Sequence, residues 1–207
     1  AKFNYHRANT IDEAESLCKE NTDASFLAGG HSLIPAMKLR LSEPGTLIDI
    51  GRISDLKGIR KEGDSIYIVA LTTHAEVASS EVVKDACAAL AETAGMIGDP
   101  QVRNRGTIGG NVVHADPASD YPGILMALKA TVVTSNRSIA VDDFFTGLFE
   151  TALNDGEMVT EIQVPVLNNG SGSGYAKFFN PASRYAVVGV GAVFTIDNGS
   201  CSSCSIG

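Results

Sequence analysis

Two glycine-containing segments carry the residue types of this chain that are best suited to chemistry. The first is Ala28-Gly29-Gly30-His31-Ser32, and the second is Arg105-Gly106-Thr107-Ile108-Gly109-Gly110-Asn111. Glycines permit positive φ, so the backbone can turn and present successive N–H groups on one concave side, where they can bind a phosphate. Two such turns about eighty residues apart predict one ligand that has a diphosphate at its middle.

These loops would have to bind an anion without a lysine or a metal ion. No lysine follows either loop in the spacing of a Walker motif, and Gly189-Val190-Gly191-Ala192-Val193-Phe194 lacks the last glycine of the dinucleotide fingerprint. The remaining donors are backbone amides and the side chains of Ser32, Thr107 and Asn111. Each glycine pair alone is more often an ordinary turn, so the hypothesis depends on their pairing.

The first loop lies within a pattern typical of a small α/β lobe. A helix is predicted from Thr10 to Asn21, a short strand over residues 25–27, a second helix over 33–41 and a second strand over 46–50. This order predicts a parallel pair of strands with the first loop at the carboxyl end, where such sheets bind ligands.

From about residue 53 the pattern changes to a second lobe. Glu62-Gly63-Asp64 predicts a hairpin, and one long helix is predicted over 82–94, with Gly95 at its end. The second glycine loop follows. Another helix is predicted over 121–128, and three further strands over 130–134, 138–141 and 158–164.

Residues 168–174 have the composition of a flexible linker, and three strands are predicted after it, over 175–179, 187–196 and 200–206. A hairpin with one uncovered face is marginal by itself. We therefore expect a C-terminal lobe that is truncated or is completed by a partner.

The two loops, together with residues 97–111 and Asp116-Pro117-Ala118-Ser119-Asp120, resemble the FAD subunits of molybdenum hydroxylases. The resemblance is to medium subunits of the carbon monoxide dehydrogenase type and, more distantly, to the FAD domain of xanthine dehydrogenase. It implies an α+β, PCMH-type FAD-binding fold, with a small α/β lobe and a larger lobe built on a mainly antiparallel sheet. The implied domains are 1–167, with lobes 1–52 and 53–167, and the start of a truncated C-terminal domain at 168–207.

The resemblance also implies which residues contact FAD. Asp120 would bind the adenosine ribose, and Lys177 would donate to the pyrimidine edge of the flavin, although simple packing or exposure is the alternative for the residues near the flavin. The implied set is Ala28, Gly29, Gly30, His31, Ser32, Leu33, Ile97, Thr107, Ile108, Gly109, Gly110, Asn111, Asp116, Asp120, Val159, Lys177 and Tyr185.

No catalytic residue and no metal site are predicted. His31 lies inside a loop that binds through its backbone, and we interpret His114 and Asp116 as hydrogen-bond partners that fix their loop. Arg103 and Arg105 could contact the diphosphate, face a partner subunit or pair with an acidic residue.

Composition excludes several classes of protein. The 207 residues are 44% hydrophobic and carry a net charge of −8, which predicts a globular core and argues against a nucleic-acid or anionic membrane surface. No apolar run reaches roughly 20 residues and the N-terminus lacks a signal-peptide pattern, so a cytoplasmic protein is expected. Cys18 and Cys87 are predicted to be buried thiols, and the Cys201/Cys204 pair lacks the second pair that a metal site needs.

The leading hypothesis is an electron-transfer subunit. FAD would take electrons from an iron–sulfur (small) subunit, which draws them from a molybdopterin (large) subunit, in a dimer of heterotrimers. One alternative is a self-contained flavin oxidoreductase, which would need an acid or base over the flavin. The other is a nucleotide-binding module without redox activity, which a flavin spectrum of the purified protein would exclude.

Overall fold

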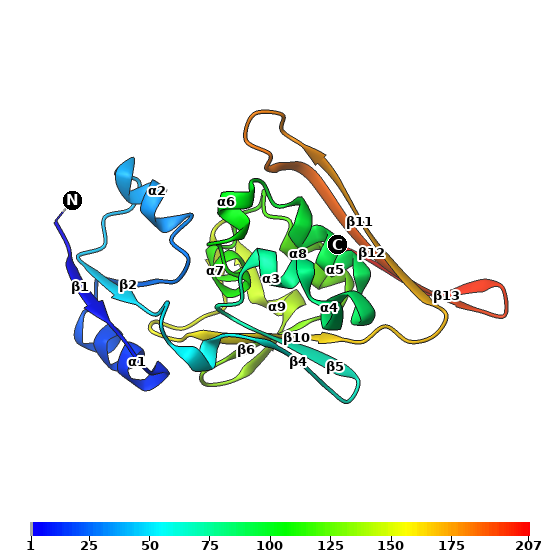
Figure 1. Cartoon of the computed structure of the whole chain (residues 1–207), viewed down its shortest axis with the longest axis horizontal. Helices are drawn as coiled ribbons and strands as arrows, with labels where there is room; N and C mark the ends of the chain where they lie inside the picture. The colour runs from blue at the N-terminus through cyan, green and yellow to red at the C-terminus, as the bar shows by residue number, and fades with distance from the viewer. Residues whose placement is uncertain (1) are drawn as a thin grey trace.

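The computed structural model describes residues 2–207 and has three layers beside a small N-terminal lobe (Figure 1). A five-stranded sheet is covered on one face by helices, and a three-stranded sheet lies on the far side of these helices. The structure therefore confirms the predicted α+β architecture, with a parallel sheet in the small lobe and an antiparallel sheet in the larger one.

The small lobe is a parallel sheet with two helices. Its elements are β1 (Asn4–Arg7), α1 (Ile11–Glu20), β2 (Ala24–Leu27), α2 (Leu33–Lys38) and β3 (Thr46–Asp49), with sheet order β1-β3-β2. The predicted parallel pairing of β2 with β3 is confirmed. Strand β1 was not predicted, because all four of its residues are exposed and show no apolar alternation.

The larger lobe is built on an antiparallel sheet with the order β4-β5-β10-β6-β7. Its strands are β4 (Ile59–Glu62), β5 (Ser65–Val69), β6 (Thr131–Thr134), β7 (Ser138–Ala140) and β10 (Val159–Pro165). A separate pair, β8 (Phe145–Gly147) and β9 (Glu150–Thr151), follows β7. The predicted hairpin at Gly63 is confirmed. Strand β10 lies at the centre of the sheet, where it pairs with β5 on one side and with β6 on the other.

Short helices cover this sheet on the side that faces the third layer (Figure 1). They are α3 (His74–Ser79), α4 (Glu81–Ala86), α5 (Ala88–Met96), α6 (Pro100–Arg103), α7 (Ile108–His114), α8 (Tyr121–Ala127) and α9 (Val141–Phe144). A single 3₁₀ turn, η1 (Ser54–Leu56), instead packs its Leu56 in the core shared with the small lobe. Across residues 2–207, no helix combines the length and apolar character needed to cross a bilayer.

The single helix predicted over 82–94 is wrong. The chain breaks at Cys87, which is extended (φ −161°), and Gly95 lies inside α5 rather than after it. Helix α5 contacts α3 and α8 as well as strand β11, and most of its residues are buried. Periodicity therefore could not reveal the break, because a helix buried on several sides has no polar stripe to mark its register.

The third layer consists of β11 (Ser171–Phe179), β12 (Ala186–Asp197) and β13 (Ser200–Ile206). The prediction of a linker over 168–174 is wrong from Ser171 onward, because Ser171 to Gly174 pair with β12. The sheet lies directly on α8: a β-carbon on Gly191 would be 2.6 Å from the Cα of Ile124. Gly191 and Gly207 also exchange two backbone hydrogen bonds of 2.9 Å.

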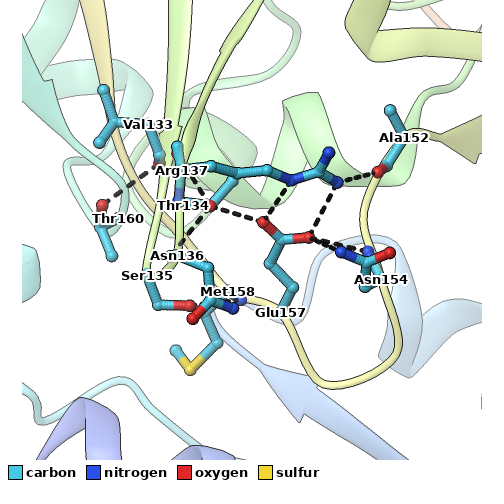
Figure 2. Close-up of polar contacts among 10 residues, drawn as sticks. All are labelled: Val133, Thr134, Ser135, Asn136, Arg137, Ala152, Asn154, Glu157, Met158 and Thr160. Carbon is cyan, nitrogen blue, oxygen red and sulfur yellow. Dashed lines mark hydrogen bonds and ion pairs between the residues drawn. The ribbon is translucent and has the colours of Figure 1, made fainter.

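The small lobe and the larger lobe share a core. The cluster around Ile48 and Ile53 also contains Val69, Leu71 and Met158 from the larger lobe. Beside Met158, the Glu157 carboxylate is bound by Arg137, Thr134 and Asn154 (Figure 2).

The Glu157 side chain is only 1% exposed, and its oxygens accept from Arg137 Nε (3.0 Å), Thr134 Oγ1 (2.6 Å) and the Asn154 N–H (2.9 Å). The guanidinium of Arg137, outweighing the cost of burial, lowers the pKa of Glu157 to about 2. The network fixes the β6–β7 turn against the segment that enters β10.

Candidate functional site

The two glycine loops meet at the junction of the lobes. A β-carbon on Gly29 would lie 2.1 Å from the carbonyl oxygen of Arg105, and one on Gly110 would lie 3.8 Å from Cβ of Ala28. Glycine at position 29 therefore permits a close approach of two backbones. The structure brings together the two segments that the sequence predicted to share one ligand.

The first loop presents a run of free backbone donors. Among residues 2–207, no acceptor is found for the N–H groups of Gly29, Gly30, His31, Ser32 and Leu33, whereas the Ile34 N–H donates to Gly30 O to begin α2. Gly30 has φ +78°, which turns the chain after β2. Successive N–H groups at the start of a helix form an anion-binding surface.

In the second loop the N–H groups of Ile108, Gly109 and Gly110 are bonded within the protein, so the prediction that this loop exposes consecutive N–H groups was wrong. The Ile108 N–H donates to Thr72 O at 3.0 Å, and the Gly109 N–H donates to Ala70 O at 2.9 Å. The Gly110 N–H is bound by the hydroxyl of Thr107, the N-cap of α7. The donors are used internally because the start of α7 packs against the end of β5.

The glycines of the second loop also differ from the prediction in their conformation. Gly106, Gly109 and Gly110 do not have positive φ. A β-carbon on Gly109 would instead lie 2.6 Å from Cβ of Ala70, and one on Gly110 would lie 2.8 Å from Thr107 Oγ1. Glycine is required at positions 109 and 110 because a side chain would not fit, and not because the backbone is left-handed.

The second loop can still contribute polar side chains. The Thr107 hydroxyl accepts from Gly110 and keeps its own hydrogen, and the Asn111 Oδ1 accepts from Ser119 Oγ, which leaves the amide NH₂ of Asn111 available. The Ile108 side chain is fully buried in the core and contributes packing.

His74 is a residue near the loops that the sequence analysis missed. It is 3% exposed, its Nδ1 lies 3.2 Å from the Tyr121 hydroxyl, and a β-carbon on Gly106 would lie 2.6 Å from its Nε2. Burial, with smaller effects of His31 and Arg103, lowers the pKa of His74 to about 4, so the ring is neutral near pH 7. No periodicity distinguished it, because it begins helix α3.

The other predicted loop residues divide in their roles. Asp116 Oδ1 accepts from the Ala118 N–H at 2.9 Å and fixes its loop, as expected. His114 instead packs its ring against Phe149, with centroids 5.3 Å apart. Arg103 donates from Nη1 to the backbone carbonyl of Ile97 at 2.6 Å, a partner that was not among those expected.

Asp120 and Lys177 form one buried ion pair. Lys177 Nζ lies 2.8 Å from Asp120 Oδ2, and the Tyr175 hydroxyl donates to Asp120 Oδ1 at 2.7 Å. The resemblance places Asp120 at the ribose and Lys177 at the flavin, two parts of FAD separated by the diphosphate. In the structure the two side chains are in direct contact, so the two predicted FAD-binding residues form one group.

Ile97 and Tyr185 lie on either side of a close contact, whereas Val159 lies elsewhere. A β-carbon on Gly98 would be 2.7 Å from Cβ of Arg184, so the turn before Tyr185 packs on the segment after Ile97. Tyr185 is 48% exposed and could face a ligand, and partial burial together with the charge of Asp116 raises its pKa. The Val159 side chain is part of the main core.

The cysteines do not form a paired site. Cys201 and Cys204 are free and exposed on β13, where three steps along a strand separate their Cα atoms by about 10 Å, too far for a disulfide. Cys87 is buried as expected, and Cys18 is partly buried.

Comparison with known proteins places this site in context. The family model described as the FAD binding domain in molybdopterin dehydrogenase matches residues 1–167. The carbon monoxide dehydrogenase medium chain of Hydrogenophaga pseudoflava is 42% identical over 197 residues, which are 93% of this chain and 69% of that protein. The glyceraldehyde dehydrogenase medium chain of Sulfolobus acidocaldarius is 42% identical over 193 residues, covering 91% and 68%.

Solved structures agree with these matches. A carbon monoxide dehydrogenase from Hydrogenophaga pseudoflava superposes with a TM-score of 0.96 at 41% identity, covering all of this chain and 74% of that one. Quinoline 2-oxidoreductase from Pseudomonas putida 86 superposes with a TM-score of 0.92 at 28% identity, covering 100% and 73%.

Proposed function

Because the chain belongs to the family of FAD binding domains in molybdopterin dehydrogenases, we propose that it is the electron-transfer subunit of a carbon monoxide dehydrogenase-like molybdenum hydroxylase. Its cofactor is FAD, and it is a subunit of an oxidoreductase. The proposed partners are an iron–sulfur (small) subunit and a molybdopterin (large) subunit, assembled as a dimer of heterotrimers. Electrons would pass from the small subunit through this chain to an external acceptor.

The observation that carries the proposal is the run of free N–H groups from Gly29 to Leu33. Five consecutive donors that have no acceptor within residues 2–207 match the oxygens of a diphosphate, and the two loops that meet also carry the hydroxyls of Ser32 and Thr107. The residues present therefore fit FAD. Bound FAD supplies the exchange of electrons singly or in pairs.

The chain's own residues bind and orient rather than perform acid–base chemistry. His31 is exposed and its N–H belongs to the donor run, while His74 is buried and neutral near pH 7. Lys177 is already paired with Asp120. The roles of these three side chains favour an electron-transfer subunit over a self-contained oxidoreductase, because the latter would need a general base beside its substrate.

The proposal is tested by two measurements on the purified chain. It should contain one FAD that is released intact on denaturation, and anaerobic mixing with candidate substrates should leave the flavin absorbance unchanged until the small and large subunits are added. Bleaching by a substrate without these partners would favour the self-contained oxidoreductase. A chain that binds no flavin would contradict both redox proposals.

A further inference from the structure

His74, the first residue of α3, lies against the second glycine loop. Its N–H donates to Gly106 O at 3.1 Å, and Thr73, the residue before it, forms an antiparallel bridge with Thr107. The edge of the His74 ring also faces Gly106, because a β-carbon on this glycine would lie 2.6 Å from Nε2 and 2.9 Å from Cδ2. His74 therefore contacts the second loop through both its backbone and its ring.

Gly106 in turn contacts the first loop. The β-carbon position of Gly29 is 3.0 Å from the Cα of Gly106 and 2.1 Å from the carbonyl oxygen of Arg105. The same glycine thus touches the His74 ring and the first loop. Because interiors are closely packed, a shift of the ring would change how closely the two loops approach each other.

Tyr121, the first residue of α8, fixes the orientation of the His74 ring. The Tyr121 hydroxyl lies 3.2 Å from Nδ1, and the two ring centroids are 5.4 Å apart. Tyr121 is fully buried, and among residues 2–207 no other hydrogen-bond partner is found for its hydroxyl. Burial, with a smaller effect of Asp120, raises the pKa of Tyr121, so the hydroxyl keeps its hydrogen and needs an acceptor.

The His74 ring can supply this acceptor because it is neutral near pH 7, its pKa being lowered to about 4 chiefly by burial. A neutral imidazole has one acceptor and one donor nitrogen. Donation from Tyr121 to Nδ1 leaves the ring hydrogen on Nε2, at the edge that faces Gly106. One hydrogen bond thus fixes the plane of the ring that contacts the second loop.

We propose that His74 is a positioning residue of the FAD site: Tyr121 fixes its ring, and the ring holds Gly106 at the distance from Gly29 at which both loops bind one ligand. This inference rests on the proposed function only in its last step, that the ligand is FAD. The earlier steps concern the chain alone and can be tested without a ligand. Side chains that act through a neighbour in this way are as necessary to a site as those that touch the ligand.

The first test measures amide hydrogen exchange in the chain without FAD. The N–H groups of Ile108 and Gly109 are the reporters, because each donates to a backbone carbonyl outside the second loop. In His74→Ala both should exchange about tenfold faster, measured relative to the amides of β10. Val77→Ala is the matched control, since it removes buried side-chain atoms one turn further along α3; the ratio should stay within about twofold of that in the unchanged chain.

His74→Asn separates positioning from stability, and it replaces His74→Ala if that variant does not fold. The Asn oxygen can accept from Tyr121 in place of Nδ1, but the side chain is too short to carry the ring edge to Gly106. It should therefore recover most of the Tm lost in His74→Ala, while the two reporter amides still exchange about tenfold faster. Recovery of both properties together, or unchanged exchange in both variants, would overturn the positioning role.

The second test measures the FAD dissociation constant in a double-mutant cycle. His74→Ala should weaken FAD binding about tenfold, and Tyr121→Phe, which removes only the hydrogen bond, about threefold. Because Tyr121 acts through the ring, Tyr121→Phe should have no further effect when position 74 is alanine. An equal effect of Tyr121→Phe in both backgrounds would contradict the inference.

Two other results would separate the steps of the proposal. Loss of FAD affinity in His74→Ala without faster exchange of the reporter amides would show that His74 acts on FAD directly, and would overturn the positioning role. If neither the unchanged chain nor any variant binds FAD, the proposed function fails, while the exchange of the Ile108 and Gly109 amides still decides whether His74 fixes the second loop.

Discussion

The absence of a side chain at Gly29 permits the two glycine loops to meet. We predict that Gly29→Ala lowers FAD affinity at least tenfold, because its β-carbon would stand 2.1 Å from the Arg105 carbonyl and neither backbone can yield without separating the loops. Fluorescence titration of the apoprotein with FAD measures this. Gly174→Ala is the matched control, since no atom lies within 4 Å of its β-carbon position.

A Gly29→Ala protein that binds FAD as tightly as the unchanged chain would show that the loop contact is not required for the ligand. A comparable loss in Gly174→Ala would instead indicate a general effect of glycine substitution.

Individual residues were predicted to different degrees. Glycine and hydroxyl content predicted both loops, but not which loop keeps its N–H groups free, since this depends on the docking of α7 against β5. The pairing of Asp120 with Lys177 joins residues 57 positions apart, and His74 meets Tyr121 across 47 positions. Such contacts have no local signature in a sequence.

The turn between β6 and β7 and the segment before β10 are held together by Glu157. Its folded pKa of about 2 is below the ordinary value of 4.5, so its ionised form stabilises the fold fully above pH 4.5 and this stabilisation is lost as pH falls toward 2. We predict that Glu157→Gln lowers the free energy of unfolding by about 1–3 kcal/mol at pH 7 and by less at pH 3. Urea unfolding at the two pH values measures the difference.

The exposed pair of Glu81 with Lys84 is the control for this measurement, because Glu81→Gln at a side chain that is 78% exposed should change stability by less than about 1 kcal/mol. An equal effect of Glu157→Gln at both pH values would contradict the role of its ionised form.

Whole elements were predicted well where one face meets solvent. The hairpin of β4 and β5 and the strand β10 followed from turn residues and alternation, whereas the division of α4 from α5 did not. Residues 171–174 were misread for a related reason: serine and glycine are typical of linkers, but here the long strand β12 supplies a hydrogen-bonding partner.

At the scale of the molecule, we propose that residues 1–167, with lobes 1–52 and 53–167, form the FAD-binding domain and that 168–207 begin another. The match of the family model to 1–167 supports this boundary. A chain ending at Leu167 should unfold cooperatively, with Tm lower by roughly 5 °C or more, because α8 and α5 lose the sheet that covers them. Calorimetry of both chains measures this.

Failure of the shortened chain to unfold as one transition would place the third sheet within the same folding unit. The proposed boundary near residue 53 does not separate two independent cores, since Val69, Leu71 and Met158 of the larger lobe pack in the core of the small lobe. The sequence predicted the order of the lobes but not this shared core, which forms between distant segments.

Because the two loops meet at Gly29 and Arg105, the stability of the folded chain should depend on the concentration of a ligand that binds both loops. The first loop belongs to the small lobe and the second to the larger one, so a ligand that touches both loops contributes its binding free energy to their association. At 100 times the dissociation constant this contribution is about 2.7 kcal/mol. The supply of FAD in a cell would then set the lifetime of the folded chain against proteolysis as well as its redox capacity.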